Sequence, residues 1–143
     1  MKENLIRLLK WGMVVLLVLS AAFFFLPYRA NNSAFKIIKL ANQMGATELV
    51  IEGILQWVVP IAFALLSGLM LTMRFSIGKC IAGTIFCVIA TILHISSINI
   101  GSGKLGAGIV VNLIIAIMGV VTPIVIIILN KRDSTTKENE VRT

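Results

Sequence analysis

The chain has 143 residues, of which 58% are hydrophobic and only 13% are charged, and its net charge is +7. Soluble domains average about 25% charged residues, so this composition cannot cover a water-exposed surface. It also excludes intrinsic disorder, which requires low hydrophobicity. The charges are unevenly placed, because four segments contain no Asp, Glu, Lys or Arg: residues 11–26, 53–73, 80–98 and 105–129. This segregation predicts an all-α membrane protein built as a bundle of four transmembrane helices.

The apolar segments predict helices because they do not alternate apolar and polar residues as barrel strands do. About 20 residues cross a hydrocarbon core of roughly 30 Å. The last three segments suffice alone, and the first reaches this length with apolar residues upstream, where Arg7 and Lys10 can extend to the interface. We expect one membrane domain over residues 1–143, with a polar tail at 130–143 that frays beyond Arg132. The predicted spans are about residues 5–27, 50–73, 80–98 and 105–129.

The first span has the basic start of a secretory signal peptide, because Lys2, Arg7 and Lys10 precede its apolar run. A strict Ala-x-Ala cleavage site is missing, and the nearest match at residues 20–22 lies inside the apolar run. We therefore expect this segment to be retained as a membrane anchor.

Basic residues predict the orientation of the bundle. Four spans place both termini on one side, which then carries nine Lys and Arg, whereas the other side carries four. The positive-inside rule places the side with nine in the cytoplasm. We therefore expect an N-in, C-in protein of the plasma membrane. The compact loops and the high Ile and Lys content favour a bacterial cytoplasmic membrane.

The first outer loop, residues 27–47, contains a predicted short amphipathic helix. Ser33 is expected to cap its start and Gly45 its end. The polar face carries Lys36, Lys39 and Gln43, and apolar residues cover the other face. We expect this helix to lie on the outer membrane surface or over the mouth of the bundle.

Two interpretations of this outer surface remain open. In the first, the short helix is a lid that only packs against the bundle. In the second, Lys36 and Lys39 contact a partner or lipid headgroups, and Lys104 in the last outer loop can meet a lipid phosphate.

Polar residues within membrane spans are the best indication of a site, because each costs free energy unless it has a partner. Five such residues lie in or near the outer ends of the predicted spans: Glu48, Glu52, Gln56, His94 and Asn112. If their helix faces converge, they form an outward-opening pocket that can hold a proton, a cation or a polar headgroup. Otherwise the glutamates lie at headgroup level, and His94 hydrogen-bonds a neighbouring helix.

Prolines and small residues predict how the helices bend and pack. Pro60 should kink the second span, because proline lacks the backbone donor of a helix interior. Small residues spaced by four predict close helix contacts at Ala64 and Gly68, and again at Gly83 and Cys87. The sequence does not say whether these faces pack within one chain or between chains.

Several functions are not expected. Residues 101–106 match GxGxxG, but no acidic residue follows about 20 positions later, so nucleotide binding is not predicted and a tight outer turn is. His94 is the only histidine, and we find no catalytic or metal-ligand motif, so neither an enzyme nor a cofactor is expected. No basic stripe is interleaved with aromatic residues, which argues against a nucleic-acid partner.

The leading hypothesis is a small non-enzymatic membrane protein that acts by binding a membrane partner. That partner is another protein or a second copy of the chain, and the role is that of an accessory subunit, an immunity factor or a regulator. The alternative is a small oligomeric transporter or channel that uses the outer polar pocket. Coupled carriers often keep an acidic residue deep in a helix, whereas the deepest candidate here is His94, which favours the binding role.

Overall fold

Four helical stretches in the computed structural model are long and apolar enough to cross a membrane. The structure describes residues 2–29, 32–100 and 104–141 of the chain. The prediction of four such helices is therefore confirmed. Their bounds are Glu3–Phe25, Thr47–Thr72, Ile77–Asn99 and Ala107–Lys131.

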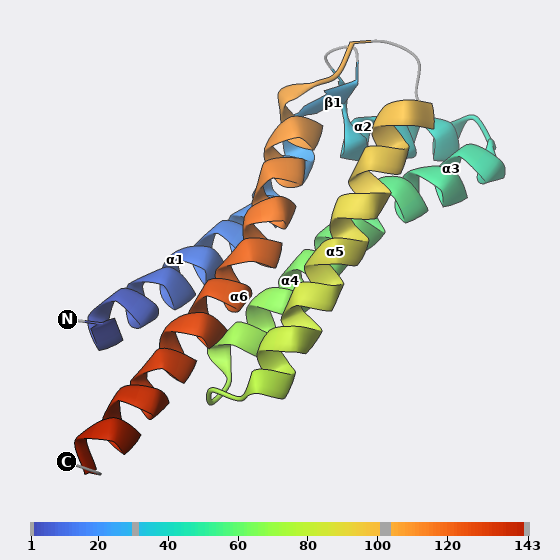
Figure 1. Ribbon diagram of the computed structural model, residues 1–143. Coiled ribbons are helices and arrows are strands. Elements are labelled where there is room, and N and C mark those ends of the chain that lie inside the picture. Colours follow the sequence, from blue (N-terminus) through green and yellow to red (C-terminus); the bar gives the residue numbers. More distant parts are fainter. Residues whose placement is uncertain (1, 30–31, 101–103, 142–143) are drawn as a thin grey trace.

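The helices form a bundle in which each long helix packs against two others (Figure 1). The four are α1 (Lys2–Ala22), α4 (Val59–Thr72), α5 (Ile77–Ile100) and α6 (Ala107–Val141). Helix α1 packs against α4 and α6, and α5 packs against the same two helices, so α1 and α6 lie side by side although they are far apart in sequence. Both chain ends lie at the same end of the bundle, which we call the terminal end; the opposite end is the loop end (Figure 1).

The second membrane stretch contains three helical pieces around Pro60. They are α3 (Thr47–Gly53), the π-helical turn η2 (Ile54–Val58) and α4. Pro60 has no N–H to donate to the carbonyl of Gln56, and its ring pushes that carbonyl away. The wider π turn accommodates this missing bond directly before the proline. The predicted kink therefore takes the form of a π-helical turn.

The loop end is built by a short antiparallel strand pair and a helix. A 3₁₀ turn, η1 (Phe23–Phe25), leads from α1 into β1 (Pro27–Arg29), which pairs with β2 (Asn32–Ser33). Helix α2 (Ala34–Gln43) follows, and the Ser33 hydroxyl accepts the Lys36 N–H at 3.3 Å. Gly45 follows its end with a φ of 70°, the left-handed conformation that favours glycine after a helix. Ser33 caps the start of α2 as predicted, whereas the C-cap is Met44 and Gly45 is the next residue. The strand pair was not predicted.

Small residues let the four helices approach one another closely in the middle of the bundle. A Cβ added at Gly68 of α4 would lie 3.4 Å from Leu17 of α1, and one added at Gly83 of α5 would lie 3.2 Å from the Ser67 hydroxyl of α4. Gly119 of α6 lies against the Cys87 thiol of α5. These small-residue faces therefore pack within a single chain.

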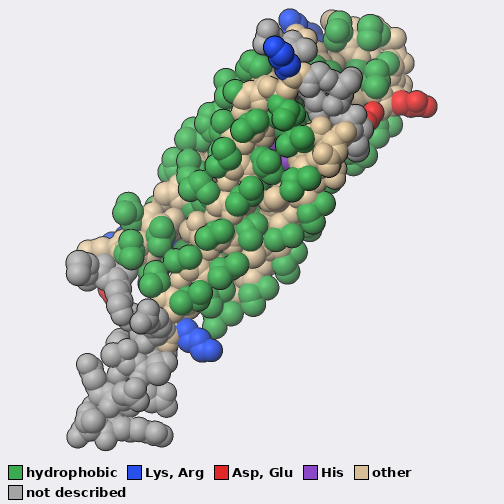
Figure 2. All heavy atoms as spheres, turned by 45° about the horizontal axis from the view of Figure 1, so that its top comes forward, with side chains coloured by type: hydrophobic (Ala, Val, Ile, Leu, Met, Phe, Trp, Pro, Cys, Tyr) green, Lys and Arg blue, Asp and Glu red, His purple; other side chains and the backbone are tan. Residues whose placement is uncertain are grey.

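The outer surface of the bundle is apolar along its length. Figure 2 shows hydrophobic side chains covering the flank, with the coloured charges gathered toward the two ends. Large side chains such as Val15, Leu69, Ile85 and Ile114 are about half exposed. A surface of this kind suits lipid, in which apolar side chains need no burial in protein.

Two sequence expectations concern segments at the ends of α6. The predicted turn at residues 101–103 lies outside the described residues. Fraying was predicted beyond Arg132, but α6 continues as a helix to Val141. The chain contains no Gly or Pro after Pro123, so no residue there forces the helix to end.

Candidate functional site

The five polar residues predicted to form one outer pocket lie in two separate environments. Glu48 and Glu52 are exposed on the flank of the bundle near its loop end, and Gln56 is half-buried beside them. His94 is 1% exposed and Asn112 is 2% exposed, so both are inside the bundle. The structure therefore does not bring the glutamates and His94 to one cavity.

The glutamates line a cavity of about 440 Å³ on the flank, which we call the acidic groove. Its lining residues come from α3, η2 and α5: Glu48, Ile51, Glu52, Leu55, Gln56, Leu93 and Ser96. The Gln56 amide donates a hydrogen bond of 2.8 Å to Glu52 Oε1. This pair follows from the i, i+4 spacing, which places both residues on one helix face.

His94 faces inward because it lies about 100° around α5 from Leu93, which lines the groove. Leu93 and Ser96 line the groove, whereas His94 and Ser97 are buried, as the helical repeat requires for neighbouring positions. Among the described residues, His94 Nδ1 has no hydrogen-bond partner. The hydroxyl groups of Thr91 and Ser97, three residues before and after His94, bond to other groups. Thr91 donates to the Cys87 carbonyl at 2.8 Å, and Ser97 accepts the Trp57 indole N–H at 2.9 Å.

Helix α2 covers the loop end above these buried residues. Ala34 is fully buried and clusters with Ile109 of α6, with Phe24 and Trp57 packed against them. A Cβ added at Gly53 would lie 2.8 Å from Ile38 of α2. Helix α2 therefore covers the mouth of the bundle. The interior around His94 does not open at the loop end, whereas the predicted pocket required such an opening.

The predicted contact lysines remain at the surface of the loop end. Lys36 and Lys39 of α2 are exposed, and so is Lys104 just before α6. Figure 2 shows basic and acidic side chains at this end of the molecule. The exposed lysines are therefore available for contact, while Ile37 and Ile38 on the same helix are partly buried.

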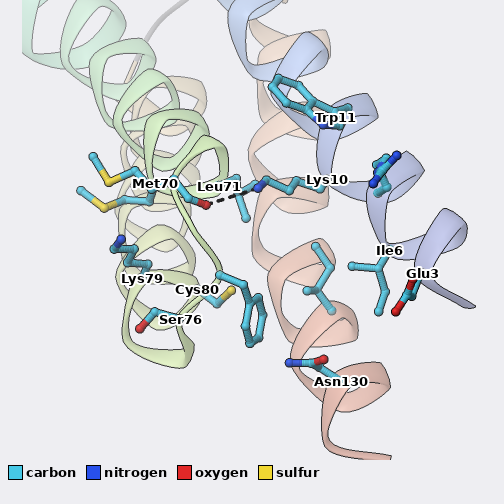
Figure 3. A pocket seen from close by; sticks show the side chains of 14 residues that line it. Glu3, Ile6, Lys10, Trp11, Met70, Leu71, Ser76, Lys79, Cys80 and Asn130 are labelled. Carbon is cyan, nitrogen blue, oxygen red and sulfur yellow. Dashed lines mark hydrogen bonds between the residues drawn. The ribbon is translucent and has the colours of Figure 1, made fainter. Parts of the chain in front are cut away.

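A further cavity at the terminal end was not predicted. This terminal pocket has a volume of about 340 Å³ and is lined by residues from all four long helices and from the connection between α4 and α5 (Figure 3). Lys10 extends across it from α1 and donates a hydrogen bond of 3.3 Å to the Met73 carbonyl. Arg7, Lys79 and Glu3 also line it.

No family model, no curated protein and no solved structure matches this chain. Within the described ranges, no group of three or more His, Cys, Asp and Glu side chains is placed to hold a metal ion. The function is therefore argued from the geometry of the acidic groove, the closed interior and the terminal pocket.

Sequence reasoning missed the terminal pocket because it used Arg7, Lys10 and Lys79 only to orient the chain. One signal was available: Lys10 and Trp11 lie three and four residues after Arg7, which places them on one side of a helix. The sequence did not show that Lys79, 69 residues beyond Lys10, faces the same cavity. That juxtaposition requires the packing of α1 against the end of α4.

Proposed function

We propose that this chain is a small, non-enzymatic, multi-pass protein of the plasma membrane that acts by binding a protein partner within the membrane. It would serve as an accessory subunit, an immunity factor or a regulator of that partner. The observation that carries the proposal is the acidic groove, which presents two carboxylates on the flank of the bundle.

The position of Glu52 makes a partner energetically favourable. It lies five residues beyond Thr47, where this membrane stretch begins, or about 7.5 Å along the helix by the α-helical rise. A carboxylate at that depth costs free energy unless it is paired. Among the described residues, no Lys, Arg or His nitrogen lies within 4.0 Å of the Glu48 or Glu52 carboxylate. A basic or hydrogen-bonding side chain from a partner helix would supply the missing pair.

The apolar residues of the groove support a helix as the occupant. Ile51 and Leu55 lie on the same flank as the glutamates and are more than half exposed, and Leu93 faces them from α5. Association of helices in lipid depends on close packing and on interhelical hydrogen bonds. A groove with both properties would recognise a membrane helix that carries a polar residue near its outer end.

The proposed orientation is N-in and C-in, in a bacterial cytoplasmic membrane. Its support is the excess of Lys and Arg in the sequence segments predicted on the side of both termini, nine against four. In this orientation the acidic groove and the polar face of α2 lie in the outer half of the membrane. Lys36 and Lys39 would then meet lipid phosphates or the outer part of the partner.

The alternative is a small oligomeric transporter or channel. Its support is the set of buried polar side chains in the bundle, Ser67, His94, Ser97 and Asn112. The close contacts at Gly68, Gly83 and Gly119 leave little room between the helices of one chain, so a transport path would have to form between copies.

Co-purification from native membranes in mild detergent tests the proposal. The wild-type chain should retain a stoichiometric protein partner, and the double variant Glu48→Gln/Glu52→Gln should lose most of it. The Glu3→Gln variant is a matched control, because it removes an exposed carboxylate at the opposite end of the bundle.

Two results would contradict the proposal. One is full retention of the partner by the double variant, which would exclude the groove as the contact. The other is flux of an ion or solute through liposomes containing only the purified chain, which would favour the transporter.

A further inference from the structure

The terminal pocket gathers three cations from two helices around one cavity. Arg7 and Lys10 come from α1, and Lys79 comes from α5. Figure 3 shows Lys10 directed across the cavity, whereas the Lys79 ammonium points away from Lys10 at the rim. The Lys10 ammonium donates to the Met73 carbonyl at 3.3 Å and lies 5.9 Å from the centre of the Trp11 ring. An ammonium group carries three donors, so this carbonyl leaves two for another acceptor. The long Lys10 side chain is therefore held across the pocket by its contacts at both edges.

The charge of the pocket is incompletely balanced by its own residues. Among the described residues, three basic side chains line the pocket, whereas Glu3 is the one acidic residue in its lining. Within the described part of the chain, no carboxylate lies within 4.0 Å of the Arg7, Lys10 or Lys79 side chain. Lys79 instead donates to the Arg74 carbonyl at 3.5 Å. The pocket therefore attracts an anion, and its cations have donors available for one.

The remaining lining of the pocket is largely apolar. Ile6, Leu71 and Ile126 lie on three different helices around it. Figure 3 shows the Trp11 indole at its edge. Tryptophan is typical of the membrane–water interface, where an apolar ring meets polar headgroups. Lys10 is seven residues from Glu3, the start of its membrane stretch, or about 10 Å by helical rise. The cavity therefore lies at the level where phospholipid headgroups join their acyl chains.

We propose that the terminal pocket binds the phosphate headgroup of an anionic phospholipid. Lys10 contacts the phosphate oxygens through charge-assisted hydrogen bonds, and Arg7 and Lys79 at the rim add to the positive charge that attracts the phosphate. The apolar residues contact the glycerol and the first part of the acyl chains. Basic pockets between transmembrane helices bind anionic headgroups in this way on the cytoplasmic side of membranes. The volume of about 340 Å³ lies within the range of ligand pockets, about 300–1,000 Å³.

This site is independent of the acidic groove, because it lies at the opposite end of the bundle and shares no residue with it. Partner binding and lipid binding can therefore each fail without affecting the other.

Fluorescence of Trp11 provides a direct test on the full chain. The sequence has two tryptophans, so a Trp57→Phe background leaves Trp11 as the single reporter. The protein is reconstituted in phosphatidylcholine vesicles, and phosphatidylglycerol with brominated acyl chains is added as the quencher. We expect a preference on the order of 25-fold for brominated phosphatidylglycerol over brominated phosphatidylcholine. Each lost cation should reduce that preference about fivefold, the factor that corresponds to about 1 kcal/mol.

Charge-matched variants separate the pocket from the general charge of the surface. Lys10→Gln/Lys79→Gln should abolish the preference, whereas Arg74→Gln/Lys131→Gln should keep it, because these two side chains do not line the pocket. Glu3→Gln should increase the preference for phosphatidylglycerol, because it removes the negative charge of the Glu3 carboxylate from the pocket. A misfolded protein would not show this increase.

Three results would overturn the proposal. The first is equal loss of the preference in both double variants, which would indicate a diffuse surface effect. The second is the absence of a preference in the wild-type pocket. The third is displacement of phosphatidylglycerol by millimolar inorganic phosphate, but not by chloride at equal ionic strength, which would assign the pocket to a free phosphate instead of a lipid.

Discussion

Gly119 of α6 lies so close to Cys87 of α5 that a methyl group at position 119 would overlap the Cys87 thiol. Met13 of α1 approaches the same point at 3.5 Å, so three of the four long helices meet there. Cys87 is fully buried. Because lipid offers helices no hydrophobic driving force to associate, such close contacts contribute much of the bundle's stability.

The Gly119→Ala substitution should destabilise the bundle by about 1–3 kcal/mol, because the new methyl group must displace Cys87 or separate the helices. The measurement is the unfolding midpoint in detergent. Gly12→Ala is the control: a Cβ there has no neighbour within 4 Å, and alanine is the better helix former. The Cys87→Ala change should restore part of the loss in the double variant, since it removes the overlapping sulfur. Equal midpoints for Gly119→Ala and Gly12→Ala would contradict this packing.

The Gly53→Leu substitution should release α2 from the bundle without unfolding it. A Cβ at position 53 would lie 2.8 Å from Ile38 of α2 and 3.3 Å from the Trp57 ring, so a larger side chain displaces the helix. Hydrogen exchange at the α2 amides should become faster, while exchange in α5 and α6 stays slow. Gly78→Leu should change neither, because a Cβ there meets only Ser76 at 3.8 Å. Unchanged exchange in α2 after Gly53→Leu would indicate that the helix is not docked.

The His94→Leu substitution should leave the unfolding midpoint unchanged or raise it. Within the described residues, His94 Nδ1 is buried without a hydrogen-bond partner, and such a group costs about 1–3 kcal/mol. Leucine fills a similar volume and carries no polar atom. If His94 is structural alone, partner binding should also be retained in this variant. A large loss of stability would show that His94 has a hydrogen-bonding role in the folded protein.

Thiol labelling should establish the orientation in the membrane. A cysteine at Asn42, exposed near the end of α2, should react with an impermeant reagent on intact cells, whereas one at Ser134 should react only after lysis. Asn42 is preferable to Ser33, whose hydroxyl caps α2. The wild-type chain is the control, because Cys80 is 4% exposed and Cys87 is fully buried. The reverse pattern would show an inverted topology.

Composition and spacing predicted much of the local structure. The segregation of charged from apolar residues predicted four helices of membrane length. Ser33 marked the start of α2, and Gly45 lies just beyond its end. The i, i+4 spacing places Glu52 and Gln56 on one helix face, and their side chains are hydrogen-bonded. These features depend only on residues near one another in sequence, so local rules suffice.

The candidate site depended on tertiary packing that local rules do not determine. In a soluble helix the apolar face points inward, but lipid is as apolar as a protein core, so hydropathy does not show how a membrane helix is rotated. The structure turns Glu52 outward on the flank and His94 inward under α2, although both lie near the same end of their predicted spans. The same rotation of α1 and α5 brings Lys10 and Lys79 to one pocket.

The low charge content and its segregation thus determined, from sequence alone, that the chain forms four helices suited to a bilayer. Only the tertiary structure decided which polar residues meet. In lipid, the faces by which helices pack depend on close contacts between small residues such as Gly119 and Cys87. Those contacts set the rotation of each helix, and the rotation places the acidic groove on the flank and the basic pocket at the terminal end.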